Sequence, residues 1–205
     1  MHEKNIKTSG KEISEAKKAL VMIHGRGGNA EDILSLRDHL NVKNYALFAP
    51  QATGNTWYPY SFLAKREQNE PGLSSALQML KELLQEIESK GFSSENIYFL
   101  GFSQGACLTL EFVTLNAKRY GGVVAFTGGL IGDRIYNDKY NGDFGGTPIF
   151  IGTGNPDPHV PVERVEKSAG ILEEMNASVT VKVYDNRPHT ISMEEIEIAN
   201  ELIFK

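Results

Sequence analysis

The sequence has 205 residues, of which 40% are hydrophobic and 23% charged, a composition typical of one ordinary globular domain. A formal charge of −5 and the lack of any lysine or arginine cluster argue against a nucleic-acid or other polyanionic partner. The single cysteine, Cys107, excludes an intrachain disulfide framework and a metal cluster of the Cys-x-x-Cys type.

Along the chain, short apolar runs alternate with stretches whose apolar residues recur at helical spacing. The apolar runs predict strands at residues 18–23, 45–49, 96–100, 122–127, 148–153 and 178–184. The periodic stretches predict helices at residues 29–40, 73–87, 104–117, 162–175 and 192–204. Asn29 is the predicted N-cap of the first helix, with Asp32 three positions later.

Strands that alternate with helices predict a mainly parallel sheet with helices on both faces, here in one α/β domain over residues 1–205. Residues 1–17 are polar, and we expect them at its periphery. No run approaches the roughly 18 apolar residues of a membrane helix, and the polar start lacks the apolar core of a signal peptide. We therefore expect a cytoplasmic protein without a membrane span.

Ser103 is the centre of a Gly-x-Ser-x-Gly motif, GFSQG, between a predicted strand and a predicted helix. A tight turn in this place lifts the serine hydroxyl clear of the sheet, and Gly101 and Gly105 relieve the crowding around it. The same letters could form an ordinary turn, but their place between a buried strand and a helix favours a nucleophile. Ligands of parallel sheets bind at this end of the strands.

A nucleophilic serine needs a base to take its proton and an acid to orient that base. For this kind of sheet the expected chain order is Ser, then Asp or Glu, then His. Asp157 lies between two prolines after one late strand, and His189 follows the next strand. Two competitors stay open: Asp185 also follows a strand, and His159 shares the loop of Asp157.

The Gly-rich stretch HGRGGN after the first predicted strand supplies a candidate oxyanion hole. The expected donors to a tetrahedral oxyanion are the backbone N–H of Arg26 and that of Gln104. The same stretch also matches the Gly-x-Gly-x-x-Ala fingerprint of dinucleotide-binding proteins. That alternative needs an acidic residue after the following strand, where the chain has Ala-Pro-Gln.

Residues 51–70 have no periodicity and mix aromatic residues with Gly, Pro and Asn on the expected catalytic side. Trp57 and Tyr58 are the candidate substrate contacts in this segment, which would suit an apolar acyl or leaving group. The alternative is that the aromatic side chains only pack the segment against the rest of the domain.

With HGRGG, GFSQGA, a DPxVP loop and a late HTI in this order, the chain resembles the phospholipase/carboxylesterase family of α/β-hydrolases. Acyl-protein thioesterases belong to the same family. The resemblance implies a compact α/β-hydrolase without a large lid domain, and a substrate that is a small-molecule ester or thioester. It implies no cofactor and no metal, and it leaves a homodimer open. The site residues it implies are a triad of Ser103, Asp157 and His189, with oxyanion donors at Arg26 and Gln104.

Two positions differ from the usual family pattern. Pro188 stands where glycine commonly precedes the histidine, and a proline there restricts the backbone of Arg187. Arg26 stands where thioesterase-type members usually have leucine, and it resembles bacterial esterase-like members instead.

We therefore expect a serine esterase that cleaves small or apolar acyl esters through an acyl-enzyme. An acyl thioesterase or a lysophospholipase-type hydrolase is the alternative within the same chemistry, because leaving-group preference depends on pocket shape. A hydrolase-like protein that only binds a ligand or partner is the alternative from another class.

Overall fold

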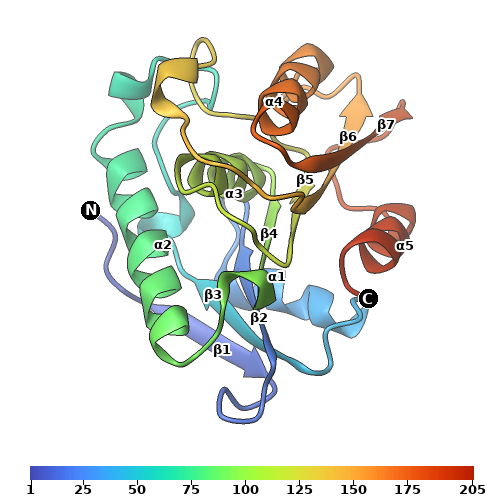
Figure 1. The fold of residues 1–205 in the computed structure, drawn as a ribbon. Helices are drawn as coiled ribbons and strands as arrows, with labels where there is room; N and C mark the ends of the chain where they lie inside the picture. Colours follow the sequence, from blue (N-terminus) through green and yellow to red (C-terminus); the bar gives the residue numbers. More distant parts are fainter.

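The computed structural model describes residues 1–205, which form one seven-stranded sheet with helices on both faces (Figure 1). The strands are β1 (Ile6–Gly10), β2 (Lys18–Ile23), β3 (Tyr45–Pro50), β4 (Ile97–Phe102), β5 (Gly122–Phe126), β6 (Pro148–Asn155) and β7 (Ser178–Asp185). Their order in the sheet is β1-β3-β2-β4-β5-β6-β7, and only β1 runs antiparallel to its neighbour. The α/β class with a mainly parallel sheet, predicted from the sequence, is confirmed.

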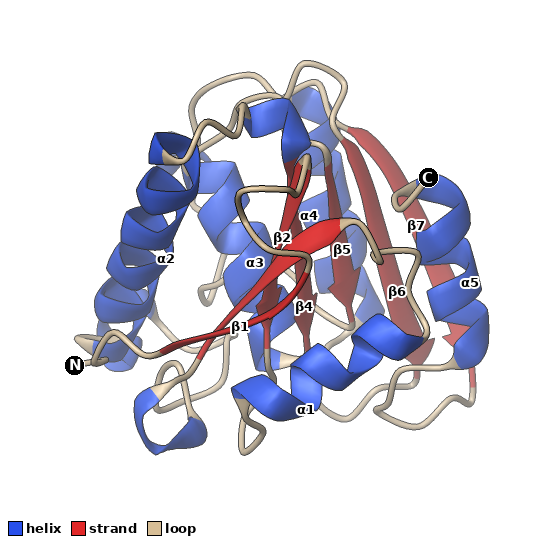
Figure 2. Ribbon diagram, turned by 90° about the horizontal axis from the view of Figure 1, so that it is seen from below, coloured by secondary structure: helices blue, strands red, loops and turns tan.

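Five α-helices cover the sheet, and Figure 2 shows them divided between its two faces. They are α1 (Ala30–Leu34), α2 (Gly72–Ser89), α3 (Gln104–Leu115), α4 (Val162–Glu174) and α5 (Met193–Leu202). Alternate residues of β2 enter two separate cores: Ala19, Val21 and Ile23 pack with α2, α3 and α4. Leu20 and Met22 pack with α1 and α5 on the other face.

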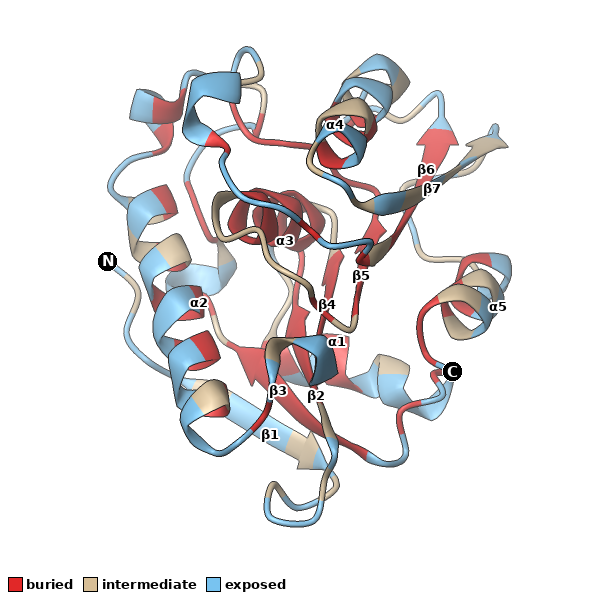
Figure 3. Cartoon of the chain, viewed as in Figure 1, coloured by how far each residue is buried: buried red, intermediate tan, exposed pale blue.

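Burial on both faces explains why the central strands are continuous apolar runs rather than alternating ones. β5 is buried along its whole length, as Figure 3 shows. The edge strand β7 has only half-buried and exposed residues, in keeping with its mixed sequence SVTVKVYD. For these strands the sequence pattern therefore reflects how deeply each one is buried.

β1 is the strand that the sequence pattern did not predict. Its sequence IKTSG is polar and its residues are half-buried or exposed, so no apolar alternation marks it. Its backbone pairs with β3 from Ile6 opposite Pro50 to Gly10 opposite Ala46. Part of the N-terminal segment expected at the periphery thus forms one edge of the sheet.

The first helix is shorter than predicted: α1 ends at Leu34 and a 3-10 turn, Ser35–Asp38, follows. Its start agrees with the prediction. The Asn29 side chain accepts from the N–H of Asp32 at 2.8 Å, and the Asp32 carboxylate accepts from the N–H of Asn29 at 3.2 Å. This reciprocal cap fixes the point at which the chain leaves the Gly-rich turn and enters the helix.

The parallel strands bring four separate loops to one end of the sheet, where the carboxyl ends of the strands lie. β2, β4, β6 and β7 run in the same direction, so the turns after them share the carboxyl edge. Those turns carry Arg26, Ser103, Asp157 and His189, respectively. None of the helices combines the length and apolar character needed to cross a membrane.

Candidate active site

Ser103 is the residue on which β4 turns into α3. Its backbone has φ 54° and ψ −119°, a conformation that residues with a side chain rarely adopt and that costs about 1–3 kcal/mol. The turn is held by the N–H of Ser103, which donates to the carbonyl of Phe126 on the neighbouring β5 at 2.9 Å. Strain of this kind persists where the surroundings fix it, and here it projects a hydroxyl from the carboxyl edge of the sheet.

The two glycines of the motif are required by close backbone contacts. A Cβ on Gly101 would lie 2.4 Å from the carbonyl oxygen of Gly105, on the first turn of the helix. A Cβ on Gly105 would lie 2.2 Å from the carbonyl oxygen of Ile23, at the end of β2. Helix α3 therefore begins in direct contact with the backbone of β2, and only glycine permits that approach.

Ser103, His189 and Asp157 form one hydrogen-bonded chain. The Nε2 of His189 lies 2.8 Å from the Oγ of Ser103, and its Nδ1 lies 2.7 Å from the Oδ2 of Asp157. A carboxylate only accepts, so Nδ1–H donates to Asp157 and Nε2 keeps a lone pair toward the serine hydroxyl. The arrangement can remove a proton from Ser103 and hold the resulting imidazolium against a carboxylate.

Asp157 is fixed by its own loop. Its other oxygen, Oδ1, accepts from the backbone N–H of His159 at 2.8 Å and of Val160 at 2.9 Å, while the side chain has no exposed surface. Burial by itself would raise the pKa of Asp157. The hydrogen bonds from His189 and from the two backbone N–H groups outweigh burial, so the pKa of Asp157 is lowered and the carboxylate form is favoured.

His189 is flanked by two aromatic rings and reaches both partners even though Pro188 precedes it. The ring of Phe102 packs against it at a centroid distance of 5.3 Å, and the ring of His159 meets it edge-on at 5.0 Å. The two competitors for triad roles lie outside the hydrogen-bonded chain. His159 contacts His189 without a hydrogen bond, and Asp185 is an exposed residue at the end of β7.

The loop of His189 is tied to α5 by an ion pair that the sequence did not reveal. The guanidinium of Arg187 contacts the carboxylate of Glu195, with side-chain exposures of only 9% and 0%. Arg187 also donates to the hydroxyl of Thr127 at 3.3 Å, after β5. One signal was present in the sequence, because Ser192 and Glu195 form an S-x-x-E capping pattern and do cap α5.

The expected oxyanion donors are adjacent to the serine. The Gly-rich turn lies against Ser103, since a Cβ on Gly25 would be 3.4 Å from the Cβ of the serine. The backbone N–H of Arg26 donates to no backbone acceptor, and that of Gln104, in the first turn of α3, is one of the N–H groups that a helix leaves without an intrahelical partner. Gln104 is moreover the first residue of α3, where the helix dipole favours negative charge.

The structure corrects the candidate substrate contacts. Trp57 is 0% and Tyr58 is 2% exposed, and both belong to the larger core rather than to an open cleft. The indole N–H of Trp57 donates to the carbonyl of His24 at 2.8 Å, which anchors the residue beneath the Gly-rich turn. The alternative that these rings pack the segment down is therefore the one that the structure supports, and Tyr60 is the exposed aromatic residue there.

His24 is a structural member of the Gly-rich turn. Its Nε2 accepts from the N–H of Ala52 at 3.1 Å, so the ring proton resides on Nδ1 and donates to the carbonyl of Gly25 at 2.7 Å. Burial lowers the pKa of His24. A neutral ring in this tautomer joins the Gly-rich turn to the start of the 51–70 segment.

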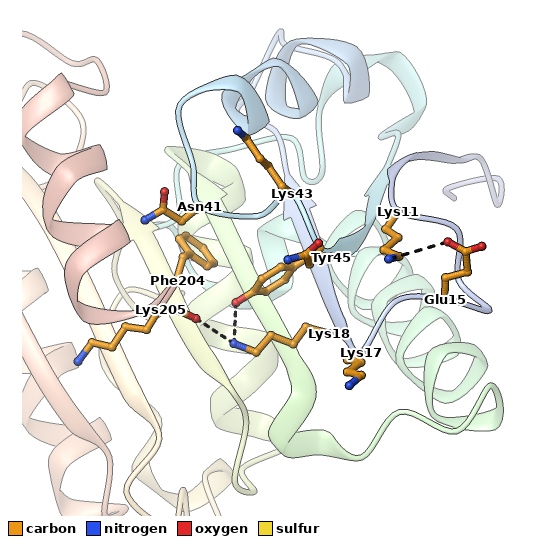
Figure 4. Close-up of a pocket in the computed structure, with 10 residues that line it drawn as sticks. Lys11, Glu15, Lys17, Lys18, Asn41, Lys43, Tyr45, Phe204 and Lys205 are labelled. Atoms are coloured by element: carbon orange, nitrogen blue, oxygen red, sulfur yellow. Dashed lines mark hydrogen bonds and ion pairs between the residues drawn. The ribbon is translucent and has the colours of Figure 1, made fainter.

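One large hollow of the molecule lies away from the serine. It has a volume of about 710 Å³ and is lined near the start of β2 and β3, at the opposite end of the sheet (Figure 4). The amine of Lys18 in it donates to the hydroxyl of Tyr45 at 3.2 Å and to the carbonyl of Lys205 at 3.1 Å. This hollow and four others, of about 320 to 430 Å³, are lined by residues other than Ser103, Asp157 and His189. No cluster of three or more His, Cys, Asp or Glu side chains could hold a metal ion.

Comparisons with known proteins agree on one family. The family model described as Phospholipase/Carboxylesterase matches residues 6–205. The crystal structure of a phospholipase/carboxylesterase from Dyadobacter fermentans is 58% identical and superposes with a TM-score of 0.99, covering 100% of this chain and 98% of that one. Acyl-protein thioesterase 1 of Saccharomyces cerevisiae is 26% identical over 90% of this chain and 91% of its own length. A probable carboxylesterase of Arabidopsis thaliana, SOBER1-like, is also 26% identical, over 90% of this chain and 77% of its own length.

Proposed function

Because this chain belongs to the phospholipase/carboxylesterase family of hydrolases, we propose that it cleaves carboxylic esters through an acyl-enzyme on Ser103. The observation that carries the proposal is the continuous hydrogen-bonded chain from Ser103 Oγ through the His189 ring to Asp157, at 2.8 and 2.7 Å. A serine in a strained turn with a base at hydrogen-bond distance, and an acid behind that base, is the arrangement that nucleophilic acyl transfer requires.

In the first step, the Oγ of Ser103 forms a bond to the carbonyl carbon while its proton moves to Nε2 of His189. The carbonyl oxygen becomes an oxyanion, for which the backbone N–H groups of Arg26 and Gln104 are the donors. The bond from carbon to the leaving oxygen then breaks as His189 returns its proton to that oxygen and the alcohol departs. Asp157 keeps the ring oriented and stabilises its charged form.

In the second step, a water molecule takes the place of the alcohol. His189 removes a proton from the water, the hydroxide attacks the acyl carbon, and the Ser103 oxygen leaves with the proton that His189 returns. The products are a carboxylic acid and the free enzyme, so the reaction consumes one water and needs no redox partner. Every proton movement uses the same ring nitrogen.

The packing around the serine favours a short acyl group. The aromatic rings that could have lined an acyl channel, Trp57 and Tyr58, are part of the core. Five hollows with volumes from about 320 to 710 Å³ are lined by residues other than the triad. Because these two rings are not available to line a channel, an acetyl or butyryl group, which needs no channel, suits the site better than a long acyl chain.

The experiment compares the wild type with Ser103→Ala on p-nitrophenyl esters from acetate to palmitate, and on a palmitoyl thioester. Ser89→Ala, which changes an exposed hydroxyl at the end of α2, is the matched control and should behave like the wild type. We expect activity that is greatest at two to four acyl carbons and that disappears in Ser103→Ala. A maximum at palmitate would favour the thioesterase or lysophospholipase alternative, and equal inertness of both proteins would favour a non-catalytic binding protein.

A further inference from the structure

The guanidinium of Arg26 is hydrogen-bonded to a segment that lies between the Gly-rich turn and α2 in the sequence. Its Nη1 donates to the hydroxyl of Thr56 at 2.9 Å and to the carbonyl of Pro59 at 3.0 Å. Its Nη2 donates to the carbonyls of Tyr58 and Tyr60 at 2.9 and 2.7 Å. Four hydrogen bonds from one side chain thus converge on residues 56–60, named here the clamped segment.

The side chain of Gln104, on α3, is hydrogen-bonded to the same clamped segment. Its Oε1 accepts from the backbone N–H of Trp57 at 2.9 Å, and its Nε2 donates to the carbonyl of Tyr58 at 2.8 Å. The carbonyl oxygen of Tyr58 therefore accepts from both Arg26 and Gln104. This oxygen joins the two residues whose backbone N–H groups are the proposed oxyanion donors, and the hydroxyl of Thr56, which accepts from Arg26 and lies 3.3 Å from Oε1 of Gln104, joins them a second time.

The clamped segment is a rigid support for these contacts. The rings of Trp57 and Tyr58 anchor it in the core. Just before it, the carbonyl of Asn55 accepts from the N–H of Gly27 at 2.7 Å, which fixes the peptide that follows Arg26. The oxyanion turn is thus held to the segment through the side chain of Arg26 and through the backbone of the next residue.

The hydrogen-bond geometry does not fit a guanidinium that binds substrate. Of its five N–H groups, four are directed at hydroxyl or carbonyl oxygens of the clamped segment, and no carboxylate pairs with Arg26. The planar guanidinium donates to several carbonyl oxygens at once. Lysine, with a single amine, cannot reproduce these hydrogen bonds. The charge of Arg26 is accordingly less important here than the shape of its donor group.

We propose that the side chains of Arg26 and Gln104 are positioning residues, which set the geometry of the oxyanion hole by holding the clamped segment through the carbonyl of Tyr58. The inference rests on the proposed function, because it assigns a task to side chains whose backbones bind the oxyanion. Loosening either grip should weaken the binding of the transition state more than that of the substrate. The effect should therefore be on kcat, with little change in KM.

The test uses Arg26→Met and Gln104→Met, which keep both backbone N–H groups and an unbranched side chain but remove the side-chain hydrogen bonds. For each we expect kcat on p-nitrophenyl acetate to fall about 10- to 100-fold, with KM within about threefold and an unchanged pH midpoint of kcat/KM. The inhibition constant of butylboronic acid, which forms a tetrahedral anion on serine, should rise in proportion to the loss in kcat/KM. Arg26→Lys should lose nearly as much as Arg26→Met, because it keeps the charge without the fork.

Arg37→Met is the matched control, since Arg37 is a partly exposed arginine near Ser9 and Asp38, away from the triad. It should leave kcat, KM and the inhibition constant unchanged. All variants are assayed at least 10 °C below their melting temperature, so that lost activity is not lost folded protein. If the melting temperature of Arg26→Met is too low for the assay, Arg26→Lys takes its place. The same result is then decisive: a fall in kcat with little change in KM.

The double variant Arg26→Met with Gln104→Met separates a shared support from two independent effects. If both residues act through the clamped segment, the loss in the double variant will be much smaller than the product of the two single losses. Multiplicative losses, or a kcat in Arg26→Met equal to that of the wild type, would overturn the inference while leaving Ser103-dependent hydrolysis intact. Absence of Ser103-dependent activity in the wild type would instead count against the proposed function.

Discussion

Arg187 and Glu195 form a buried ion pair two residues from the candidate base, His189. The pair joins the loop after β7 to the first turn of α5, and Glu195 also accepts from the backbone N–H of Ser192 at 2.9 Å. The chain places an unusual proline, Pro188, in this loop, yet the ring of His189 reaches both Ser103 and Asp157. A glycine at position 188 would leave the loop flexible. The ion pair at Arg187 constrains the loop instead.

Removal of the Arg187 guanidinium should therefore destabilise the protein strongly. In Arg187→Met the carboxylate of Glu195 remains buried without its cation, and such a change costs about 3–5 kcal/mol. The matched control is Lys182→Met, which breaks the exposed pair of Lys182 and Glu194, where about 0–1 kcal/mol is expected. Urea unfolding followed by circular dichroism measures both values. Equal and small losses in the two variants would show that the buried pair does not hold the loop.

Asp157→Asn should reduce kcat by roughly 10³- to 10⁴-fold without unfolding the protein. An amide in this place can still accept from the N–H groups of His159 and Val160 through one oxygen. It can also turn an NH₂ group toward Nδ1 of His189, which favours the tautomer that cannot take the proton of Ser103. Steady-state kinetics on a short p-nitrophenyl ester, beside a thermal melt, measure the effect. Asp138→Asn, on an exposed 3-10 turn, is the control, and a comparable loss there would remove the case for Asp157 as the orienting acid.

Gly105→Ala should destabilise the protein, whereas Gly170→Ala should stabilise it. A Cβ at position 105 would be 2.2 Å from the carbonyl oxygen of Ile23, so β2 and α3 must separate, at a cost of about 1–3 kcal/mol or more. Gly170 lies inside α4 with nothing near its Cβ position, so alanine there should add about 0.5–1 kcal/mol through helix propensity. We expect the melting temperature to be lower than that of the wild type in Gly105→Ala and higher in Gly170→Ala. A neutral Gly105→Ala would mean that the motif glycine is not needed for the close approach.

Most of the fold, and the meeting of Ser103, His189 and Asp157 in one hydrogen-bonded chain, could be predicted from the sequence. Strands buried on both faces must be continuous apolar runs, and helices that cover them must be amphipathic, so both leave a pattern. The proximity of these three residues was predictable because parallel strands end on the same side of the sheet, which brings Ser103 and His189 together although they are 86 residues apart. Chain order and topology alone were enough for that step.

Other features left no pattern. β1 was missed because an edge strand needs backbone hydrogen bonds but no buried face. The burial of Trp57 was not predictable, because an aperiodic segment gives no indication of which residues point inward. The contacts of Arg26 with the clamped segment, and of Arg187 with Glu195, join residues by side-chain geometry, which composition and spacing do not encode.

His24 should make the stability of the folded protein depend on pH. Burial, the largest influence, lowers the pKa of His24; the bond to Gly25 and the charge of Asp32 oppose this, and His2 adds a small further lowering. The folded protein therefore resists protonating the ring, whereas the unfolded chain binds a proton near pH 6.5. Since the unfolded state then binds more protons, stability is complete above about pH 6.5 and falls as the pH decreases toward the folded pKa, with a slope of at most about 1.4 kcal/mol per pH unit.

Urea unfolding at intervals of half a pH unit between pH 5 and 8 measures this slope. His24→Gln can still accept from the N–H of Ala52 but carries no titrating proton, so the slope between pH 5 and 6.5 should decrease even if the variant is less stable at pH 8. His39→Gln, at an exposed position after the 3-10 turn, should keep the wild-type slope. A slope that His24→Gln leaves unchanged would mean that the acid sensitivity comes from other groups, such as the carboxylates. The neutral ring of His24 would then have no part in the response to pH, although it still joins the Gly-rich turn to Ala52.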